Sequence, residues 1–241
     1  VHLFLEKNNF SIYLDASGDP LYQRGFRVGS VEAPIKENLA AGIIKLSGWE
    51  PGQAFLDPMC GSGTFLIEAA LIATNQAPGL KRNFGFMAWK NFDKALFKDI
   101  KKSYQNAIIQ KDFLRIYGSD KDLRAVRVSK KNLVLAGFEN CIQLACKQFN
   151  EIKPPLDEGV LVTNPPYGER IGDDEDLDNA YPDWARTLKQ SFAGWSTYFL
   201  TNDFRMPKLM RLAPSKKTPL FNGALDCRLF EIKMVAGSNR K

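Results

Sequence analysis

Phe55-Leu-Asp-Pro-Met-Cys-Gly-Ser-Gly-Thr-Phe-Leu-Ile-Glu68 is the stretch on which the prediction of the fold rests. It is typical of a short buried strand at 54–56, an acid at the strand tip (Asp57), a turn with two glycines (Gly61 and Gly63) and a helix. In open α/β sheets, ligands bind beyond the carboxyl ends of the strands. The stretch therefore predicts an α/β fold with a nucleotide-like ligand at this turn.

The chain has the composition of an ordinary globular protein. Of its 241 residues, 44% are hydrophobic and 25% are charged, which argues against disorder. It contains no apolar run near the roughly 20 residues that cross a bilayer, and its start lacks the basic flank of a signal peptide. Four cysteines without a Cys-x-x-Cys pair and a single histidine argue against a metal site and favour reduced thiols in a cytoplasmic protein.

After the opening stretch, strands alternate with helices. Strands are expected at 115–120, 141–146, 159–163 and 196–201. The 159–163 segment is almost purely apolar, as a central parallel strand buried on both faces should be. Asn222-Gly223 marks a hairpin between final strands at 217–221 and 225–234. The pattern predicts an α/β fold with a mostly parallel sheet, a C-terminal antiparallel hairpin and helices on both faces.

Two segments stand apart from this pattern. Residues 1–30 hold alternating apolar residues around an Asn8-Asn9 turn, with a candidate third strand at Leu21-Tyr-Gln-Arg24. Residues 77–112 join a loop of basic and aromatic residues to a helix expected from Asp93 to Asp112. We therefore divide the chain into a small N-terminal unit (1–30) and a main domain (31–241) with an insertion at about 77–112.

The glycine turn does not match the two commonest phosphate-binding motifs. The P-loop pattern is absent, and Leu66 stands where a dinucleotide fingerprint has its third glycine. Glycines let the backbone approach a ligand closely, and a helix N-terminus favours a carboxylate. Asp120, at the tip of the next strand, can accept hydrogen bonds from ribose hydroxyls, or it can cap the helix that follows. The turn predicts a nucleoside-like cofactor.

A second motif, Asn164-Pro-Pro-Tyr167, follows the strand at 159–163 directly. Prolines fix φ and hold the preceding residue extended, so this turn is rigid. The Asn164 amide oxygen and the Pro165 carbonyl can both accept hydrogen bonds from an amine, which draws its nitrogen toward a tetrahedral shape and aims the lone pair at a methyl group. Tyr167 can stack on a flat substrate. Asn164, Pro165, Pro166 and Tyr167 are the catalytic candidates, and a plain proline-rich turn is the alternative.

On these residues the sequence resembles the class I S-adenosylmethionine-dependent methyltransferases, and among them the RNA guanine-N2 methyltransferases that carry an upstream RNA-binding THUMP domain. It looks most similar to the first catalytic half of the bacterial bifunctional 23S rRNA enzymes. The matching segments run from about Ser30 to the end: Ala33-Pro-Ile-Lys-Glu37, Leu56-Asp-Pro-Met-Cys-Gly-Ser-Gly-Thr64, Ala77-Pro-Gly79, Gly118-Ser-Asp120, Asn164-Pro-Pro-Tyr-Gly-Glu-Arg170 and Asn222-Gly-Ala-Leu-Asp-Cys227. The second and fifth segments together are a specific combination.

The resemblance implies a class I (Rossmann-like) methyltransferase sheet, S-adenosyl-L-methionine as the cofactor and large-subunit ribosomal RNA as the partner. It implies that Asp120 contacts the ribose and that Asn164 to Tyr167 hold the target amine. Residues 1–30 would end a THUMP-containing region, and the full protein would continue into a second methyltransferase domain. The implied contacts of the cofactor's methionine end are Pro34, Lys36, Asp57, Pro58, Cys60, Gly61, Ser62, Gly63 and Thr64.

One position departs from the family pattern. Relatives place an acid after the third strand to contact the adenine amine, whereas this chain has Lys147-Gln148 there, which leaves Gln148 as the candidate. Methylation of adenine N6 in nucleic acid and of glutamine N5 in a protein use the same chemistry and stay as alternatives. An RNA-binding module that has lost catalysis is a further alternative, which the intact motifs disfavour.

Residues for an RNA substrate are expected outside the two motifs. Phe84, Phe86 and Trp89 are candidates to line a channel for a base, because RNA bases are commonly read by stacking. The alternative is that they pack the inserted helix. The basic face from Arg124 to Lys131 can hold phosphates or be a solvated helix face. The formal net charge of +6 suits a polyanionic partner.

Overall fold

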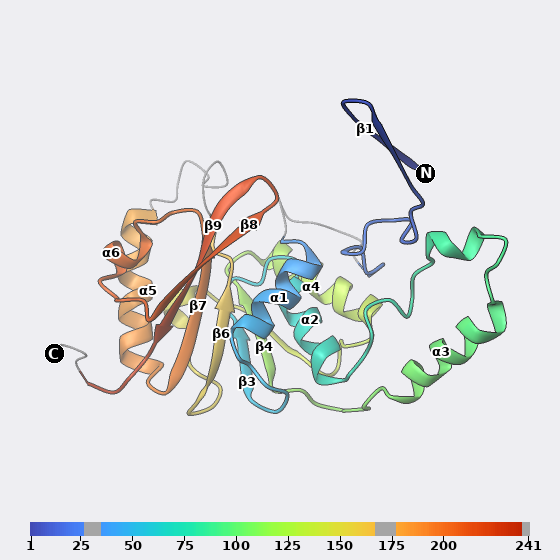
Figure 1. The fold of residues 1–241 in the computed structure, drawn as a ribbon. Coiled ribbons are helices and arrows are strands. Elements are labelled where there is room, and N and C mark those ends of the chain that lie inside the picture. The colour runs from blue at the N-terminus through green and yellow to red at the C-terminus, as the bar shows by residue number, and fades with distance from the viewer. Residues whose placement is uncertain (27–34, 167–176, 238–241) are drawn as a thin grey trace.

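A seven-stranded sheet in the order β5-β4-β3-β6-β7-β9-β8 forms the centre of the computed structural model, which describes residues 1–26, 35–166 and 177–237 (Figure 1). The predicted α/β class and the C-terminal hairpin are confirmed. The parallel strands are β3 (Ala54–Asp57), β4 (Ile116–Asp120), β5 (Gln143–Cys146), β6 (Gly159–Thr163) and β7 (Trp195–Thr201). The antiparallel strands are β8 (Lys216–Asn222) and β9 (Leu225–Lys233).

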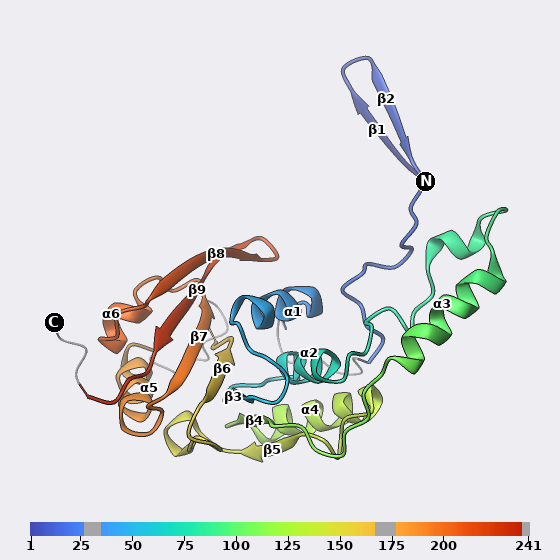
Figure 2. The same ribbon diagram turned by 60° about the horizontal axis from the view of Figure 1, so that its bottom comes forward.

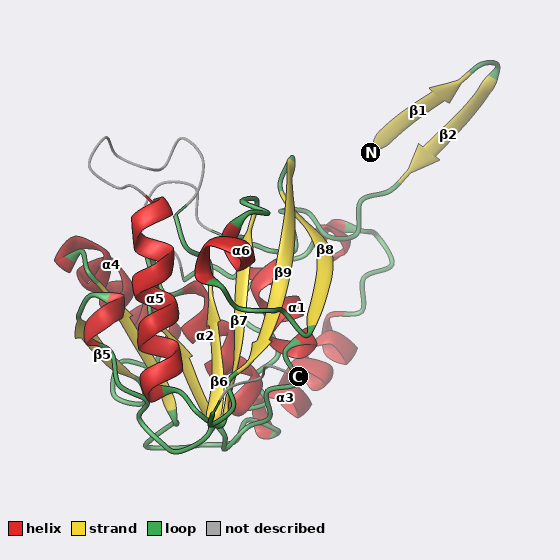
Figure 3. Cartoon of the chain, turned by 90° about the vertical axis from the view of Figure 1, so that its left-hand side faces the viewer, coloured by secondary structure: helices red, strands yellow, loops and turns green. Residues whose placement is uncertain are grey.

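Helices cover both faces of the sheet (Figures 2 and 3). One core packs α1 (Glu37–Leu46), α2 (Thr64–Ala73) and α4 (Leu123–Ala136) on the sheet, and the other packs α5 (Leu177–Ser191) and α6 (Met206–Met210). β6 serves both cores, because Val160 and Val162 point to the first and Leu161 to the second. Among the described residues, none of the helices is long and apolar enough to cross a membrane.

Gly118 in β4 lets α2 pack closely on the sheet. A Cβ at this position would clash with the Leu66 side chain of α2 and would lie 2.9 Å from Leu144 Cδ2. The close approach places the N-terminus of α2 at the carboxyl ends of β3 and β4, where parallel α/β sheets bind ligands.

The N-terminal residues form a hairpin that projects from the body (Figure 2). β1 (His2–Glu6) pairs with β2 (Asn9–Tyr13), and the turn lies at Lys7-Asn8, one residue before the predicted position. The predicted third strand at 21–24 is wrong, since Leu21 and Tyr22 form a turn and the next two residues belong to no strand. The reason lies in Arg24, whose guanidinium points inward and pairs with Glu68 of α2 at 3.1 Å.

The insertion packs mainly on itself. α3 (Lys94–Asn106) ends before the predicted Asp112, because the Ile109 N–H donates to the Thr74 carbonyl at 2.8 Å and draws the chain back to α2. Phe86 stacks on Phe84, and its ring meets that of Phe97 in α3 at 5.6 Å between centroids. The alternative interpretation is confirmed only in part: Phe84 and Phe86 pack on α3 but not on the sheet, and Trp89 is exposed.

Arg82 joins the insertion to the segment that follows the hairpin. Its guanidinium donates hydrogen bonds to the carbonyls of Ser17, Asp19 and Pro20. The Phe86 N–H donates to the Ala16 carbonyl at 3.1 Å. The turn at 15–20 and the insertion thus hold each other in place through backbone carbonyls.

Replacement of Arg24 by methionine is expected to lower the free energy of unfolding by about 3 kcal/mol, because it leaves Glu68 buried without its cation. Burial already raises the pKa of Glu68. The loss should therefore be smaller at pH 5, where the carboxyl can take up a proton, than at pH 8. Urea denaturation at both pH values measures the change.

Arg124→Met is the matched control, since the pair of Arg124 with Asp122 is exposed and its loss should leave stability nearly unchanged. The double variant Arg24→Met, Glu68→Leu should recover part of the loss, because an apolar pair carries no desolvation cost. An equal loss in the Arg24 and Arg124 variants would contradict the assignment.

Candidate functional site

Asp57 ends β3 and is buried at the carboxyl edge of the sheet. Its carboxylate accepts hydrogen bonds from the Thr163 hydroxyl at 2.9 Å and from the Met59 N–H at 3.2 Å. Burial, with a smaller contribution from the nearby Asp120 carboxylate, raises the pKa of Asp57 to about 7, although both hydrogen bonds oppose the shift. The side chain therefore titrates near neutral pH.

The glycine turn is clamped from two sides. The Gly61 N–H donates to the Asp120 carboxylate at 2.9 Å, and the Ser129 hydroxyl of α4 donates to the Gly61 carbonyl at 2.7 Å. The Asn132 amide donates to the Ser62 carbonyl at 2.9 Å. Gly63 caps α2 in the left-handed region (φ +81°), which L side chains rarely adopt. The turn is thus fixed by hydrogen bonds from β4 on one side and from α4 on the other.

Asn164 and Pro165 follow β6 directly, beside the Asp57 tip of β3. The Oδ1 atom of Asn164 is buried, and within the described residues it accepts no hydrogen bond. A buried polar atom without a partner is costly, so its place in a site usually signals a ligand donor. Asn164 thus offers an acceptor for which the described residues supply no donor.

A cavity of about 560 Å³ opens between these motifs. Its charged lining is acidic: the described lining residues include Asp57, Asp120, Asp122 and Asp183 against the single cation Lys121. A phosphate-bearing ligand would meet repulsion here, whereas a ligand with cationic and hydroxyl groups would be attracted.

The structure brings most of the predicted site residues to this cavity. Gly63 and Pro165 are not among the lining residues. Lys36 lies elsewhere, in a second hollow between α1 and β8, with its ammonium over the Tyr22 ring. Pro34 and Tyr167 fall outside the described residues. The predicted residues that line the cavity are Asp57, Pro58, Cys60, Gly61, Ser62, Thr64, Asp120, Gln148, Asn164 and Pro166.

Many residues of the site were not predicted from the sequence, among them two polar residues of α4 and two aromatic residues of the cavity lining. Ser129 and Asn132, the buried clamp residues of α4, are three positions apart and so share one helix face. Two polar residues on the apolar face of a predicted helix were the signal that could have found them. Phe149 and Trp184 line the cavity, and their ring centroids are 5.3 Å apart. No sequence motif distinguishes these two aromatic residues from those that pack in the core.

Asp120 does not cap α4, so the alternative role that its position suggested is wrong, and its contact with a ribose stays a prediction. One carboxylate oxygen accepts from the Gly61 N–H and the other from the Asp122 N–H at 3.0 Å. The N-cap of α4 is Asp122, whose carboxylate accepts from the Arg124 N–H at 2.8 Å. Asp120 therefore holds the turn and the start of the helix segment together while facing the cavity.

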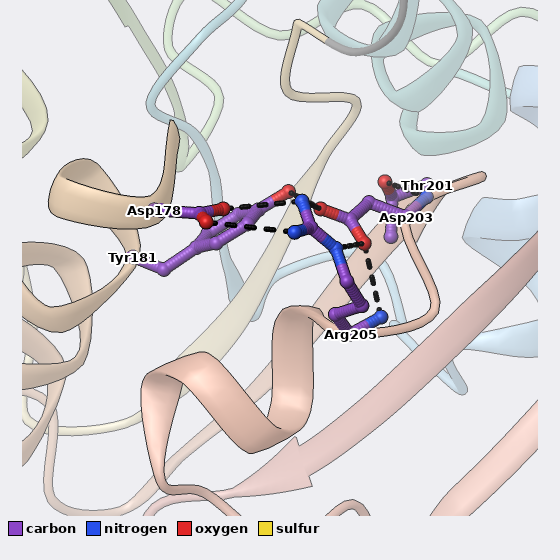
Figure 4. Close-up of polar contacts among 5 residues, drawn as sticks. All are labelled: Asp178, Tyr181, Thr201, Asp203 and Arg205. Carbon is purple, nitrogen blue, oxygen red and sulfur yellow. Dashed lines mark hydrogen bonds and ion pairs between the residues drawn. The ribbon is translucent and has the colours of Figure 1, made fainter. Parts of the chain in front are cut away.

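A polar cluster lies between α5 and the loop after β7 (Figure 4). Arg205 binds Asp178 at the start of α5 at 3.1 Å and Asp203 at 3.0 Å. The Tyr181 hydroxyl donates to Asp203 at 3.4 Å, and the Asp203 N–H donates to the Thr201 hydroxyl at 3.0 Å. The cluster ties α5, which carries Asp183 and Trp184 of the lining, to the loop after β7.

The sheet order, the glycine turn after β3 and the acceptor after β6 define a class I methyltransferase-type α/β domain. The profile of the RMKL-like methyltransferase domain matches residues 24–231. The chain belongs to this family, which confirms the predicted resemblance.

Individual relatives agree with this assignment. A Ribosomal RNA large subunit methyltransferase K/L from Shewanella sp. (strain W3-18-1) is 41% identical over 236 residues, covering 96% of this chain and 33% of the relative. The chain thus spans about a third of the length of such curated relatives.

Solved structures share the fold closely. The crystal structure of a protein assigned as a methyltransferase and complexed with SAH is 39% identical, with a TM-score of 0.86 over 93% of this chain and 58% of that chain. A protein from Listeria monocytogenes str. 4b F2365, named as a predicted N6-adenine-specific DNA methylase, is 34% identical, with a TM-score of 0.83 over 91% of this chain and 57% of that chain.

Asp57→Asn is expected to remove a pH dependence of stability. The native state keeps the Asp57 proton up to about pH 7, whereas the unfolded chain loses it near the ordinary value of 3.8. The free energy of unfolding of the unmodified protein should therefore fall as pH rises from 4 to 7 and stay low above 7. The variant should be more stable at pH 8, by about 4 kcal/mol at most, and the gain should vanish near pH 4.

Urea denaturation between pH 4 and pH 8 measures this difference. The asparagine oxygen can still accept from Thr163 and Met59, so the variant changes the charge and keeps the contacts. A stability difference that is the same at every pH would show that Asp57 titrates at its ordinary pKa.

Proposed function

We propose that the chain transfers a methyl group from S-adenosyl-L-methionine to the exocyclic N2 amine of a guanine in large-subunit (23S) ribosomal RNA. The observation that carries the proposal is the buried Asn164 Oδ1, which no described residue satisfies and which lines the cavity beside the glycine turn. An amine N–H is the donor that such an acceptor lacks. When bound, S-adenosylmethionine supplies an electrophilic methyl group on a sulfonium.

The residues of the cavity suit this cofactor. Its amino and sulfonium groups are cationic, which matches the acidic lining. Asp57 and the turn from Pro58 to Thr64 would take the methionine end, and Asp120 the ribose hydroxyls. Phe149 would pack on the adenine, with Gln148 at its edge. Lys36 is left out of this set, because the structure places it in the second hollow.

The amine would be activated by acceptors alone. Asn164 Oδ1 and the Pro165 carbonyl would each accept one of its hydrogens, and Tyr167, outside the described residues, would stack on the base. Charge develops on the nitrogen only as the methyl group arrives, so a fixed pair of acceptors stabilises the transition state more than the ground state. No histidine is available for general-base chemistry beyond His2, which lies in the exposed hairpin.

The RNA substrate is supported by the name of the Shewanella relative and by the net charge of +6. Methylation of adenine N6 is the second candidate, which the name of the Listeria protein favours. The projecting hairpin fits the further proposal that residues 1–30 end an upstream THUMP-containing region. A second methyltransferase domain would then account for part of the length that the relatives have beyond this chain.

Ser129→Ala is expected to weaken binding of S-adenosylhomocysteine about fivefold, because the Gly61 carbonyl loses a hydrogen bond worth about 1 kcal/mol. Isothermal titration calorimetry measures the affinity. Ser103→Ala, which removes a similar hydroxyl-to-carbonyl bond from the insertion, should leave the affinity unchanged. No binding by the unmodified protein would remove the proposed cofactor.

Asn164→Ala is expected to reduce turnover at least about 100-fold while the affinity for S-adenosylhomocysteine stays within about twofold, because the lost acceptor acts mainly in the transition state. The assay uses ribosomal RNA from a strain that lacks the corresponding gene, followed by mass spectrometry of the nucleosides. N2-methylguanosine is the expected product. N6-methyladenosine as the product would support adenine methylation instead. Near-normal turnover of the Asn164→Ala variant would contradict activation of the amine by the Asn164 acceptor.

A further inference from the structure

At the carboxyl edge of the sheet, an arginine guanidinium packs over an exposed aromatic ring. Phe204, in the loop after β7, is 51% exposed, and the Arg228 guanidinium carbon lies 4.8 Å from its ring centroid. Arg228 donates to the Asp226 carboxylate and to the Cys227 carbonyl. These bonds neutralise the guanidinium and fix its orientation, so the pair presents a flat surface rather than a free charge.

The loop cannot withdraw the ring from solvent. Phe204 stands between Asp203 and Arg205, and both neighbours are anchored in the polar cluster of Figure 4. Arg205 in turn is held by Asp178 of α5. An exposed phenylalanine is normally free to turn onto the nearest apolar surface, but here the backbone on each side is held by charged hydrogen bonds. The exposure is therefore built into the loop.

The pair lies on the same edge of the sheet as Asn164. Thr163, the last residue of β6, pairs with Phe199 of β7, and β7 continues to Thr201, which pairs with Arg228 of β9. The glycine turn follows β3, on the opposite side of β6. A polymer whose target base sits at Asn164 finds the β3 side occupied by the cofactor, so its neighbouring nucleotides extend over β7 and β9.

We propose that Phe204 and Arg228 form a stacking site for a base that flanks the target nucleotide in single-stranded RNA. The inference rests on the proposed function, because that function places a nucleotide at Asn164. Aromatic rings and guanidinium planes are the surfaces on which proteins stack unpaired bases, and such stacking tolerates any base. The site would hold the strand in register while the target base enters the cavity.

The test is steady-state methylation of unmodified 23S ribosomal RNA, transcribed in vitro, by the 241-residue chain. Phe204→Ala should raise KM for RNA about tenfold, with kcat and the affinity for S-adenosylhomocysteine nearly unchanged. Phe204→Trp should retain the low KM, whereas Phe204→Leu, which is apolar without a π face, should behave like the alanine variant. Phe113→Ala is the control, because Phe113 is 49% exposed but precedes β4, at the opposite edge.

Arg228→Lys separates stacking from charge. It should raise KM while leaving the slope of affinity against salt concentration unchanged, since the charge is kept. A KM for the Phe204→Ala variant equal to that of the unmodified protein would overturn the proposal and leave the pair as a surface for another protein.

Direct binding keeps the two proposals distinguishable. If the unmodified chain methylates no RNA, the proposed function fails. The stacking site is then tested by binding of a single-stranded RNA oligomer that contains 2-aminopurine, because stacking on a protein ring quenches the fluorescence of this base. Weaker binding and reduced quenching with Phe204→Ala, but not with Phe113→Ala, would still support the site. Equal binding by both variants and the unmodified protein would overturn it.

Discussion

The hydrogen bond from the Thr163 hydroxyl to the Asp57 carboxylate joins the two halves of the site. Thr163 is the last residue of β6 and Asp57 the last of β3, so this buried contact locks the two strand tips together. The glycine turn leaves from one tip and Asn164 from the other. A site that transfers a group between two ligands needs their binding loops at a fixed separation, and here one short side-chain bond between neighbouring strands supplies that constraint.

The strands and the two motifs could be predicted because their signals are local. The apolar run at 159–163, the Asn222-Gly223 turn and the glycines at 61 and 63 each act through their own backbone. The errors occur where a distant partner decides the structure. Residues 21–24 carry a strand pattern, but Arg24 is needed by Glu68, and the predicted end of the inserted helix is overridden by the contact of Ile109 with Thr74.

The site shows the same limit. Sequence motifs identify Asp57, Gly61 and Asn164 as site residues. No motif identifies Ser129 and Asn132, which hold the turn from a helix about 70 positions further along the chain. Lys36 is the reverse case, because the family resemblance placed it near the cofactor, whereas in the structure it lines the second hollow. Sequence spacing can name a loop, but only packing decides which helix holds it and which side chains face the cavity.

The contacts of Arg82 bear on how such proteins can be recombined. The Arg82 guanidinium donates hydrogen bonds to the carbonyls of Ser17, Asp19 and Pro20. These contacts therefore depend on the backbone path of the turn and not on its side chains. A chimaera that exchanges residues 77–112 between relatives can therefore tolerate a different sequence at 15–20, provided that the backbone follows the same path. An insertion from a relative without an arginine at this position would leave the three carbonyls without this hydrogen-bond donor. The exchanged insertion would then no longer be held to the turn at 15–20.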